Sequence, residues 1–398
     1  MIANRVSNIA FSATMQINQK ARQMRSQGID VIDLSVQEPD FPTPPAVKQS
    51  AINAINDDYT KYTAAGGAPE LLHAIVNYLK KNFGVSYQPN EIIVSNGAKH
   101  SLYNVFMAMI NHGDEVIIPM PYWVSYPEQV KMAEGVPIFV ETTEEDNFLL
   151  TAAQLNAVIT DKSKALVLCN PSNPTGTVYS RKNLQELADV CMKHGITIVS
   201  DEIYSKLIYD NFEFVSVAQL GEEVKAHCVI INGMSKGYCM TGWRIGYAAG
   251  PAELIAAMGK IQSHSTSNPV SVSQQAAIAA LQDEPAEVEV MRRELQKRRN
   301  YIYEKFKAIP RITVCEPHGG ISVFPNISGY FNTGDKDAII VDSVDFTNFL
   351  LERAHVAGVP GKAFGAERYI RISYANSTEN IEKAMNRITE ALHYLHEL

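Results

Sequence analysis

The stretch "KALVLCNPSNPTGTVYSRKNLQELADVCMKHGITIVSDEIY", residues 164–204, holds two apolar runs separated by a loop and a segment with helical spacing. Each run, "KALVLC" and "ITIVSDE", is apolar at consecutive positions rather than at alternate ones. Such runs are typical of strands that are buried on both faces, as in parallel sheets covered by helices. The stretch therefore predicts a strand–helix–strand unit of an α/β fold.

Five more apolar runs of this kind lie between about residues 91 and 250, and helical patterns alternate with them. They are "EIIVS", "DEVIIP", "VPIFVE", "CVIINGMS" and "WRIGYAAG". Repeated alternation of strands and helices is typical of a mostly parallel sheet with helices on its faces. We predict an α/β fold whose large domain, residues 46–290, contains a mostly parallel seven-stranded sheet.

The last hundred residues have a different pattern, which indicates a second, smaller domain of α+β type. A charged helix is predicted around residues 287–307, and a final amphipathic helix over "TENIEKAMNRITEALHYL". Short strands are predicted at "ITVCEP", "ISVFPN" and "RYIRISY". The proline-rich "EPDFPTPPAVKQS" breaks regular structure near residues 38–45 and connects an N-terminal arm to the large domain. The small domain is therefore predicted to combine residues 1–45 with residues 291–398.

The composition excludes several classes of protein. The chain has 398 residues and a formal net charge of -8, which disfavours a surface that collects nucleic-acid phosphates. The densest basic stretch, "MRRELQKRRNYIYEKF", contains interleaved glutamates and is interpreted as a solvated helix face. No apolar run approaches the roughly 20 residues that span a bilayer. We expect a cytoplasmic protein that binds neither nucleic acid nor membrane.

The five cysteines, at positions 169, 191, 228, 239 and 315, are scattered along the chain. An odd number with no CxxC spacing favours neither a disulfide framework nor a zinc site. We therefore expect a reducing compartment and no metal.

Polar residues follow several predicted strands, at the edge of the sheet where α/β folds bind their ligands. Lys236 follows "CVIIN" and a short turn, and burial there would lower the pKa of the amine and make it a nucleophile. Asp201 ends "ITIVSD", where a buried carboxylate needs a cationic partner, and Tyr204 lies three residues further. Taken singly, each has a simpler interpretation as a surface lysine, a capping aspartate or a core tyrosine.

Other strand ends carry groups that suit an anion or a planar ring. The loop "NPSNPTG" positions Asn173, and the turn "SNGAKH", with Gly97 and Ala98, opens a helix whose first N–H groups attract phosphate. Arg244 in "TGWRIG" adds a forked donor for the same phosphate. Trp123 in "PYWVSYP" can stack on a ring, although an aromatic residue at such a position is also typical of a core.

Together these segments have the groups that a pyridoxal-phosphate site needs. The chain resembles the class I aminotransferases of the aspartate aminotransferase superfamily (fold type I), and in particular the bacterial-type enzymes. The resemblance runs from about residue 10 to 395 and is carried by "EPDFPTP", "TKYTAAGGAPELLHAI", "SNGAKHSLYN", "PYWVSYPE", "NPSNPTG", "SDEIY", "MSKGYCMTGWRIGY" and "RISYANS". It implies pyridoxal 5'-phosphate as cofactor and ping-pong transfer of an amino group from an amino acid to a 2-oxo acid.

The resemblance also implies roles for individual residues. Lys236 would hold the cofactor and move the substrate proton, and Asp201 would keep the ring nitrogen protonated. Tyr204 and Asn173 would bond the ring oxygen. The phosphate would be bound by Gly97, Ala98, Lys99, Ser235, Arg244 and, in a homodimer with shared sites, the partner subunit's Tyr62. Trp123 would stack on the ring and border the substrate, and Arg371 in "RISYANS" would grip the α-carboxylate with help from Asn173.

Substrate choice depends on a few positions. In the subgroup that the chain resembles, a lysine at the position of Lys99 can bind the distal carboxylate of a dicarboxylic amino acid. The resemblance therefore favours aspartate and glutamate, unless Lys99 is a surface lysine at a helix start. Gln37 stands where most relatives have glycine and is expected to alter the rim above the substrate carboxylate. "GGIS" at 319–322 stands where relatives often carry "GAFY", so one wall of the side-chain pocket is expected to lose aromatic residues.

Three other functions stay open. An aminotransferase of broader specificity would accept aromatic amino acids or prephenate. A β-eliminating C–S lyase on the same scaffold would release pyruvate from a sulfur-containing amino acid with no oxo acid added. A regulator that binds the cofactor and controls transcription is disfavoured, because such relatives carry an added N-terminal DNA-binding domain and this chain is acidic.

Overall fold

The seven predicted strands pair into one sheet in the computed structural model, which describes residues 2–11, 13–282, 285–335 and 338–397. The strands are β2 (Ile92–Ser95), β3 (Glu115–Met120), β4 (Val136–Glu141), β5 (Ser163–Cys169), β6 (Thr197–Asp201), β7 (Cys228–Gly233) and β8 (Gly246–Ala249). Their order is β2-β8-β7-β6-β5-β3-β4, and β8 runs antiparallel to both of its neighbours while the other pairs are parallel. The predicted α/β class and the mostly parallel seven-stranded sheet are confirmed.

Successive residues of these strands point into two apolar cores on opposite faces of the sheet. Ile230 of β7 belongs to one core, and its neighbours Val229 and Ile231 belong to the other. Every residue of β7 is buried. Because both faces are covered, the strands are apolar at consecutive positions, which is the pattern that identified them.

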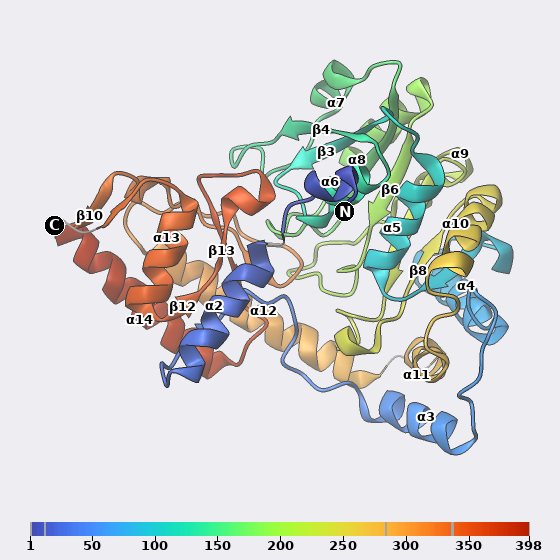
Figure 1. Cartoon of the computed structure of the whole chain (residues 1–398), viewed down its shortest axis with the longest axis horizontal. Coiled ribbons are helices and arrows are strands. Elements are labelled where there is room, and N and C mark those ends of the chain that lie inside the picture. The colour runs from blue at the N-terminus through green and yellow to red at the C-terminus, as the bar shows by residue number, and fades with distance from the viewer. Residues whose placement is uncertain (1, 12, 283–284, 336–337, 398) are drawn as a thin grey trace.

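Helices cover both faces of the sheet (Figure 1). The core that contains Val229 is closed by α5 (Ala98–Met109), α6 (Ser125–Met132) and α10 (Ala252–Ser265). The core that contains Ile230 is closed by α3 (Pro45–Asn56), α4 (Pro69–Phe83), α7 (Ala152–Val158), α8 (Arg181–His194), α9 (Glu222–Lys225) and α11 (Ser271–Gln282). Helix α5 begins directly after the "SNG" turn, as predicted.

Most of the remaining elements lie to one side of the large sheet in Figure 1, whereas α1 (Asn4–Ser7), at the end marked N, lies beside α6. Their strands are β1 (Ile32–Asp33), β9 (Ser322–Val323), β10 (Thr333–Asp335), β11 (Ala338–Ile340), β12 (Val356–Ala357), β13 (Val359–Pro360) and β14 (Ile370–Ser373). They form the pairs β1-β12 and β10-β11 and the three-stranded sheet β13-β14-β9. The α-helices are α1 (Asn4–Ser7), α2 (Ala13–Ser26), α12 (Ala286–Lys307), α13 (Ser343–Phe349) and α14 (Thr378–Glu397). The two helices predicted in the last hundred residues are therefore present.

Short 3-10 helices and one π-helix are the remaining elements in the part of the chain that the structure describes. They are η1 (Pro89–Glu91), η2 (Val217–Leu220), η3 (Thr241–Trp243), η4 (Ser328–Tyr330), the π-helix η5 (Leu350–Ala354) and η6 (Gly361–Phe364). Of these, η3 lies in the β7–β8 connection and helps to place the residues described below.

The strand predicted at "ITVCEP" is wrong. In that segment Thr313 makes an isolated bridge to Asn326 and no ladder follows. Its side chains contact a loop of the large sheet instead, since Thr313 Oγ1 donates to Glu144 Oε2 at 2.9 Å and Cys315 Sγ lies 3.4 Å from the Glu144 carbonyl oxygen. An apolar run becomes a strand only where a neighbouring strand offers it a row of hydrogen-bonding groups.

The solvated face predicted for the basic helix is wrong at two positions. Arg298 and Arg299 of α12 are only 7% and 0% exposed. Arg299 pairs with Asp210 and, at 2.6 Å, with Glu316. A buried guanidinium needs such partners, and they come from segments that the helical spacing does not identify.

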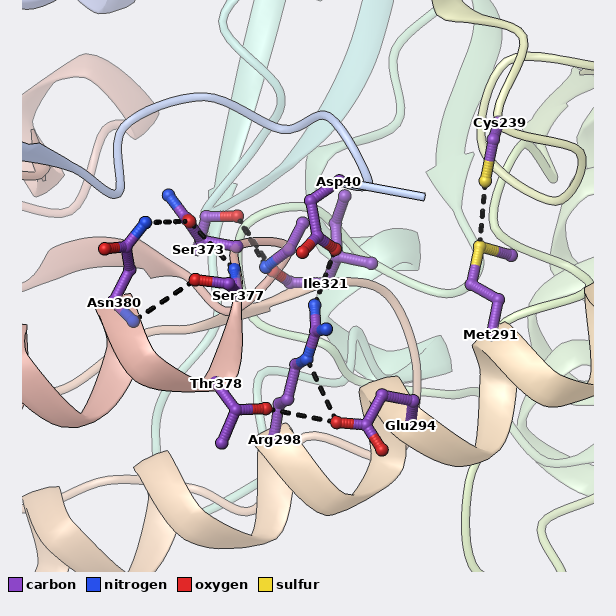
Figure 2. A network of polar contacts seen from close by, with 12 residues as sticks. Asp40, Cys239, Met291, Glu294, Arg298, Ile321, Ser373, Ser377, Thr378 and Asn380 are labelled. Atoms are coloured by element: carbon purple, nitrogen blue, oxygen red, sulfur yellow. Dashed lines mark hydrogen bonds and ion pairs between the residues drawn. The ribbon is translucent and has the colours of Figure 1, made fainter. Parts of the chain in front are cut away.

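Arg298 joins three distant segments (Figure 2). Its Nη1 lies 2.6 Å from Asp40 Oδ1 in the proline-rich connection, and its Nε lies 3.4 Å from Glu294 Oε1 in the same helix. Thr378, at the start of α14, donates to the same Glu294 oxygen at 3.1 Å. The network therefore ties the residues near 40, helix α12 and the C-terminal helix to one another.

Candidate active site

One large cavity lies where the parallel strands end at their carboxyl termini. Its volume is about 1080 Å³, and residues that follow β5, β6 and β7 line it together with the first turn of α5 and strand β14. Because parallel strands end at one edge of the sheet, residues far apart in the sequence meet there. The cavity brings together Gln37, Ala98, Lys99, Trp123, Asn173, Asp201, Tyr204, Ser235, Lys236, Arg244 and Arg371, all of which were predicted site residues.

Lys236 extends into this cavity from the turn after β7. Its Nζ donates a hydrogen bond to the backbone carbonyl oxygen of Gln37. Burial lowers the pKa of the amine to about 8; Glu38 opposes this shift, and the charges of Arg371, Arg244 and Lys99 add to it. A useful fraction of the amine is therefore unprotonated and nucleophilic near neutral pH.

Asp201 is the last residue of β6 and is 5% exposed. Its Oδ2 accepts a hydrogen bond from the Tyr126 hydroxyl at 2.7 Å, and its Oδ1 accepts one from the Ile203 N–H at 3.2 Å. Burial raises the pKa of this carboxyl to about 6 in spite of both hydrogen bonds. A cation placed against the carboxylate, such as a protonated ring nitrogen, would favour its ionised form.

Arg371 enters the cavity from β14 and is 2% exposed. Its Nη1 donates to Asn173 Oδ1 at 3.1 Å and its Nη2 donates to the Ser35 carbonyl oxygen at 2.7 Å. Its Nε has no hydrogen-bond partner among the described residues. Burial lowers the pKa of the guanidinium to about 10, so it stays charged at neutral pH. A buried cation with an unused donor is suited to a carboxylate.

Tyr204 and Trp123 border the space between these groups. The Tyr204 hydroxyl lies 3.4 Å from Gln37 Oε1, and burial raises the pKa of the phenol far above its usual value, so it is a neutral donor. The Lys99 ammonium lies 4.9 Å from the centroid of the Trp123 ring, and burial lowers the pKa of this amine. Lys99 thus brings its amino group to the cavity wall from α5, a different element from the strand β14 that carries Arg371.

The start of α5 and Arg244 form a cup for an anion. Gly97 has a φ of +85°, and a side chain at that position would collide with the Arg244 guanidinium. The N–H groups of Ala98 and Lys99 open the helix and so have no partner within it. Ser235 adds a hydroxyl beside them in the same cavity. These groups are suited to a phosphate.

Tyr62 and the segment 319–322 lie outside the cavity lining. The Tyr62 side chain is 90% exposed. Gly319 packs against Pro171, where a side chain would collide with the proline ring, and Ser322 Oγ donates to the Pro174 carbonyl oxygen at 3.0 Å. The segment "GGIS" therefore packs against the "NPSNPTG" loop, and its effect on substrate choice stays a prediction.

Sequence reasoning missed Tyr126 and the N-terminal arm. Tyr126 lies in the first turn of α6, three residues after Trp123, which precedes the helix, and the two rings contact each other with centroids 5.3 Å apart. This spacing was the available signal. Helix α2 contributes Met15 and Gln19 to the mouth of the cavity, and its polar sequence carries no comparable signal.

These residues fit the predicted cofactor. Lys236 offers an amine to an aldehyde, Asp201 is a buried carboxylate that needs a cation, and the glycine at position 97 lets the Arg244 guanidinium lie close to the start of α5. Among the described residues no three His, Cys, Asp or Glu side chains are grouped to hold a metal ion. In the same part of the chain no helix is long and apolar enough to cross a membrane.

Comparison with known proteins agrees with this geometry. The family model "Aminotransferase class I and II" matches residues 29–388. An aspartate aminotransferase of Bacillus sp. (strain YM-2) is 50% identical over 389 residues, 98% of each chain. The crystal structure of the aspartate aminotransferase from Rhizobium meliloti superimposes with a TM-score of 0.96 at 40% identity, covering 99% of both chains. The Thermus thermophilus aspartate aminotransferase with maleate gives a TM-score of 0.93 at 39% identity, covering 98% of this chain and 99% of that one.

Proposed function

Because the chain belongs to the aminotransferase class I and II family, we propose that it transfers the amino group of aspartate or glutamate to a 2-oxo acid such as 2-oxoglutarate. Aspartate aminotransferases that are about half identical over nearly the whole chain support this choice of substrate. Enzymes of this family use pyridoxal 5'-phosphate. When bound, the cofactor supplies an aldehyde that bonds to amines and an electron-poor ring that accepts electrons from the substrate Cα.

One observation carries the proposal: the cavity that holds the buried amine of Lys236 is also lined by Arg22, Lys99, Arg244 and Arg371, and of these Arg371 and Lys99 are assigned to the substrate carboxylates. Arg371 comes from β14 and Lys99 from the start of α5, so they approach the cavity from different elements. Two cations around one amine suit a dicarboxylic amino acid, with one carboxylate for each. The maleate bound by the Thermus thermophilus enzyme is also a dicarboxylate.

In this proposal several residues would hold the cofactor. Lys236 would bond it covalently, Asp201 would pair with its ring nitrogen and Trp123 would stack on its ring. Tyr204 and Asn173 would donate to the ring oxygen. Its phosphate would be bound by the cup described above, formed by Gly97, Ala98, Lys99, Ser235 and Arg244.

The chain's own residues then order and move protons. Arg371, with Asn173 bonded to it at 3.1 Å, holds the α-carboxylate and so turns the substrate Cα toward Lys236. When the amino group of the substrate takes the place of Lys236 on the cofactor, the Lys236 amine is released. This amine, whose pKa of about 8 lies near neutral pH, would then remove the Cα proton and hold it for return in the later proton transfer. Tyr126 keeps the Asp201 carboxylate in place through its 2.7 Å hydrogen bond. The amino group would stay on the cofactor after the first oxo acid leaves and before the second one binds, so the kinetics should be ping-pong.

A half-reaction screen tests the substrate. The cofactor-loaded protein is mixed with aspartate, glutamate, alanine or cysteine conjugates in turn, and the change in cofactor absorbance is followed. Aspartate and glutamate should convert the cofactor once and stop until 2-oxoglutarate is added. Continuous release of pyruvate from a cysteine conjugate without any oxo acid would favour an eliminating lyase instead.

Replacing Lys99 separates dicarboxylic substrates from the rest. Lys99→Ala should weaken the binding of aspartate about 10- to 100-fold, which corresponds to the loss of one charged hydrogen bond. The binding of alanine should stay nearly unchanged. The ratio of the two half-reaction rates is the measurement. Equal losses for both amino acids would contradict a role for Lys99 at the distal carboxylate.

We also propose that the protein is a homodimer with shared sites in the cytoplasm. Tyr62 lies 90% exposed outside the cavity of its own chain, and we assign it to the phosphate cup of the partner subunit. The five cysteines are all free thiols, as suits a reducing compartment.

A further inference from the structure

A buried glutamine on α10, Gln262, holds the loop that carries Tyr62 against the large sheet. Its side chain is 0% exposed. Its Nε2 donates to the Ala65 carbonyl oxygen at 2.6 Å and to the Val94 carbonyl oxygen at 2.7 Å. Ala65 lies three residues after Tyr62 in a segment without helix or strand, and Val94 belongs to β2. The loop is therefore fixed by a buried contact although Tyr62 itself is exposed.

The acceptor side of the same carboxamide reaches the elements that form the phosphate cup of its own chain. Gln262 Oε1 accepts from Ser95 Oγ at 2.7 Å and from Asn104 Nδ2 at 2.9 Å. Ser95 is the last residue of β2, two residues before Gly97, and Asn104 lies on α5, the helix that begins at the cup. Both of these partners are 0% exposed. All four hydrogen-bonding positions of this carboxamide are therefore in use.

A second buried glutamine, Gln274 on α11, holds the same loop by itself. Its side chain is also 0% exposed. Its Nε2 donates to Thr63 Oγ1 at 3.0 Å and to the Pro269 carbonyl oxygen at 2.9 Å. Its Oε1 accepts from the Ala68 N–H at 2.7 Å. Among the described residues, no hydrogen bond of this side chain reaches β2 or α5, so Gln274 is linked to the loop and not to the cup.

A buried carboxamide with four partners fixes their relative positions. If one partner moves, a buried polar group is left unpaired, and that is costly. In a dimer with shared sites, the loop that carries Tyr62 serves the cup of the partner subunit, whereas β2 and α5 serve the cup of their own chain. One side chain is therefore linked to both cofactor sites.

We propose that Gln262 is a positioning residue for both cofactor sites of the dimer: it holds the cup of its own chain through Ser95 and presents Tyr62 to the cup of the partner subunit. This inference rests on the proposed function and on the proposed homodimer. Gln262 contacts neither cofactor nor substrate in this role. A change at Gln262 should weaken cofactor binding in both sites, and a change at Gln274 should weaken it only in the site of the partner subunit.

Mixed dimers separate the two links. Lys236→Ala in one chain leaves one site that can bond pyridoxal phosphate covalently, in the other chain. Gln262→Met in the chain that keeps Lys236 tests the cup of that chain, and Gln262→Met in the Lys236→Ala chain tests the Tyr62 loop that this chain presents. Gln274→Met in either chain is the matched control. The dissociation constant is obtained by titrating the absorbance of the lysine-bound cofactor.

Gln262→Met should weaken cofactor binding about 10-fold in either chain, as expected for the loss of about one hydrogen bond. Gln274→Met should weaken it to a similar extent in the Lys236→Ala chain and should stay within about twofold of the wild type in the other chain. These two patterns distinguish a link to both sites from a link to the loop alone.

A double change shows whether Gln262 acts through Tyr62. In the Lys236→Ala chain, Tyr62→Ala combined with Gln262→Met should weaken cofactor binding no more than Tyr62→Ala alone, because the side chain that Gln262 positions is then absent. A general loosening of the fold would instead add its own loss to that of Tyr62→Ala.

Gln262→Glu is the second variant if Gln262→Met does not form a dimer. It keeps an acceptor for Ser95 and Asn104 and loses the amide donor to Ala65. Its larger loss of cofactor affinity should therefore appear when it lies in the Lys236→Ala chain. Equal losses in the two chains, or a larger loss in the chain that keeps Lys236, would contradict the assignment.

A loss from Gln262→Met in only one of its two placements would overturn the inference, as would full additivity with Tyr62→Ala. Both results leave the proposed function intact. If Tyr62→Ala in the Lys236→Ala chain has no effect, the sites are not shared, and the inference falls together with the proposed homodimer. A wild type that loads cofactor but takes no amino group from aspartate or glutamate would overturn the proposed function instead.

Discussion

Lys236 and Asp201 show how burial prepares single residues for chemistry. Burial disfavours the charged form of each, so the pKa of the amine falls to about 8 and the pKa of the carboxyl rises to about 6. In the polypeptide alone, neither group has a full counter-charge in the cavity. A ring cation beside Asp201 would stabilise the buried carboxylate, and a covalent bond to the cofactor would remove the need to bury a charged Lys236 amine. Both effects are physical reasons for this site to hold a cofactor tightly.

The rate at which cofactor-free protein captures pyridoxal phosphate should depend on pH through Lys236. Only the unprotonated amine attacks the aldehyde, and its fraction rises as the pH passes its pKa. Because that pKa is lowered from 10.5 to about 8, the rate should rise to half its maximum near pH 8. Stopped-flow absorbance measures this, with free Nα-acetyl-lysine as the control. A midpoint near pH 10 would contradict a desolvated amine.

Helix α12 is the element whose sequence was interpreted least well. Its basic residues are partly a solvated face, as the exposed Lys297 shows, and partly a set of buried anchors. Arg298 reaches Asp40 in the "EPDFPTP" segment, directly after the residues that line the cavity at Gln37. The helix therefore helps to hold the cavity rim in place from outside.

Asp40→Asn should lower the thermal midpoint of the protein by about 2–5 °C, because it removes one carboxylate from a buried guanidinium while Glu294 remains. Lys297→Met on the same helix is the control; its ion pair with Glu294 is exposed, and it should change the midpoint by less than about 1 °C. Differential scanning calorimetry measures both. Equal shifts of the thermal midpoint for the two variants would show that the ion pair between Arg298 and Asp40 does not stabilise the protein.

At the scale of the whole molecule, the cavity lies between the large sheet and β14. We propose that residues 46–290 form one domain and that residues 1–45 with 291–398 form the other. In this division Lys236, Asp201 and the phosphate cup belong to the large domain, and Arg371 and Gln37 belong to the small one. The cofactor and the α-carboxylate would then be held by different domains.

Sharing of sites between subunits can be tested with mixed dimers. Tyr62→Ala should weaken cofactor binding, and Lys236→Ala should abolish covalent attachment. A dimer with one subunit of each kind keeps one site in which Lys236 and the partner's Tyr62 are both intact. That site should bind cofactor as tightly as the wild type, by titration at limiting pyridoxal phosphate. Retention of the weak Tyr62→Ala affinity would mean that each chain completes its own site.

The sequence by itself determined the sheet and most of the residues at its edge. Buried parallel strands are apolar at consecutive positions, and the residue after each strand is placed by the strand itself, so Asp201, Asn173 and Lys236 could be predicted from local pattern. Their meeting in one cavity follows from the parallel arrangement. Arg371 and Tyr62 were predicted only from the resemblance to a family, because no local pattern assigns them.

Only the tertiary structure decided which side chains touch. The hydrogen bond from Tyr126 to Asp201, the ion pair of Arg298 with Asp40 and the unpaired donor of Gln37 each depend on segments that are distant in sequence. The same is true of "ITVCEP", whose apolar pattern found no strand to pair with. Periodicity records the environment of a residue along its own element, whereas hydrogen bonds and ion pairs act over a few ångströms and depend on how the elements pack.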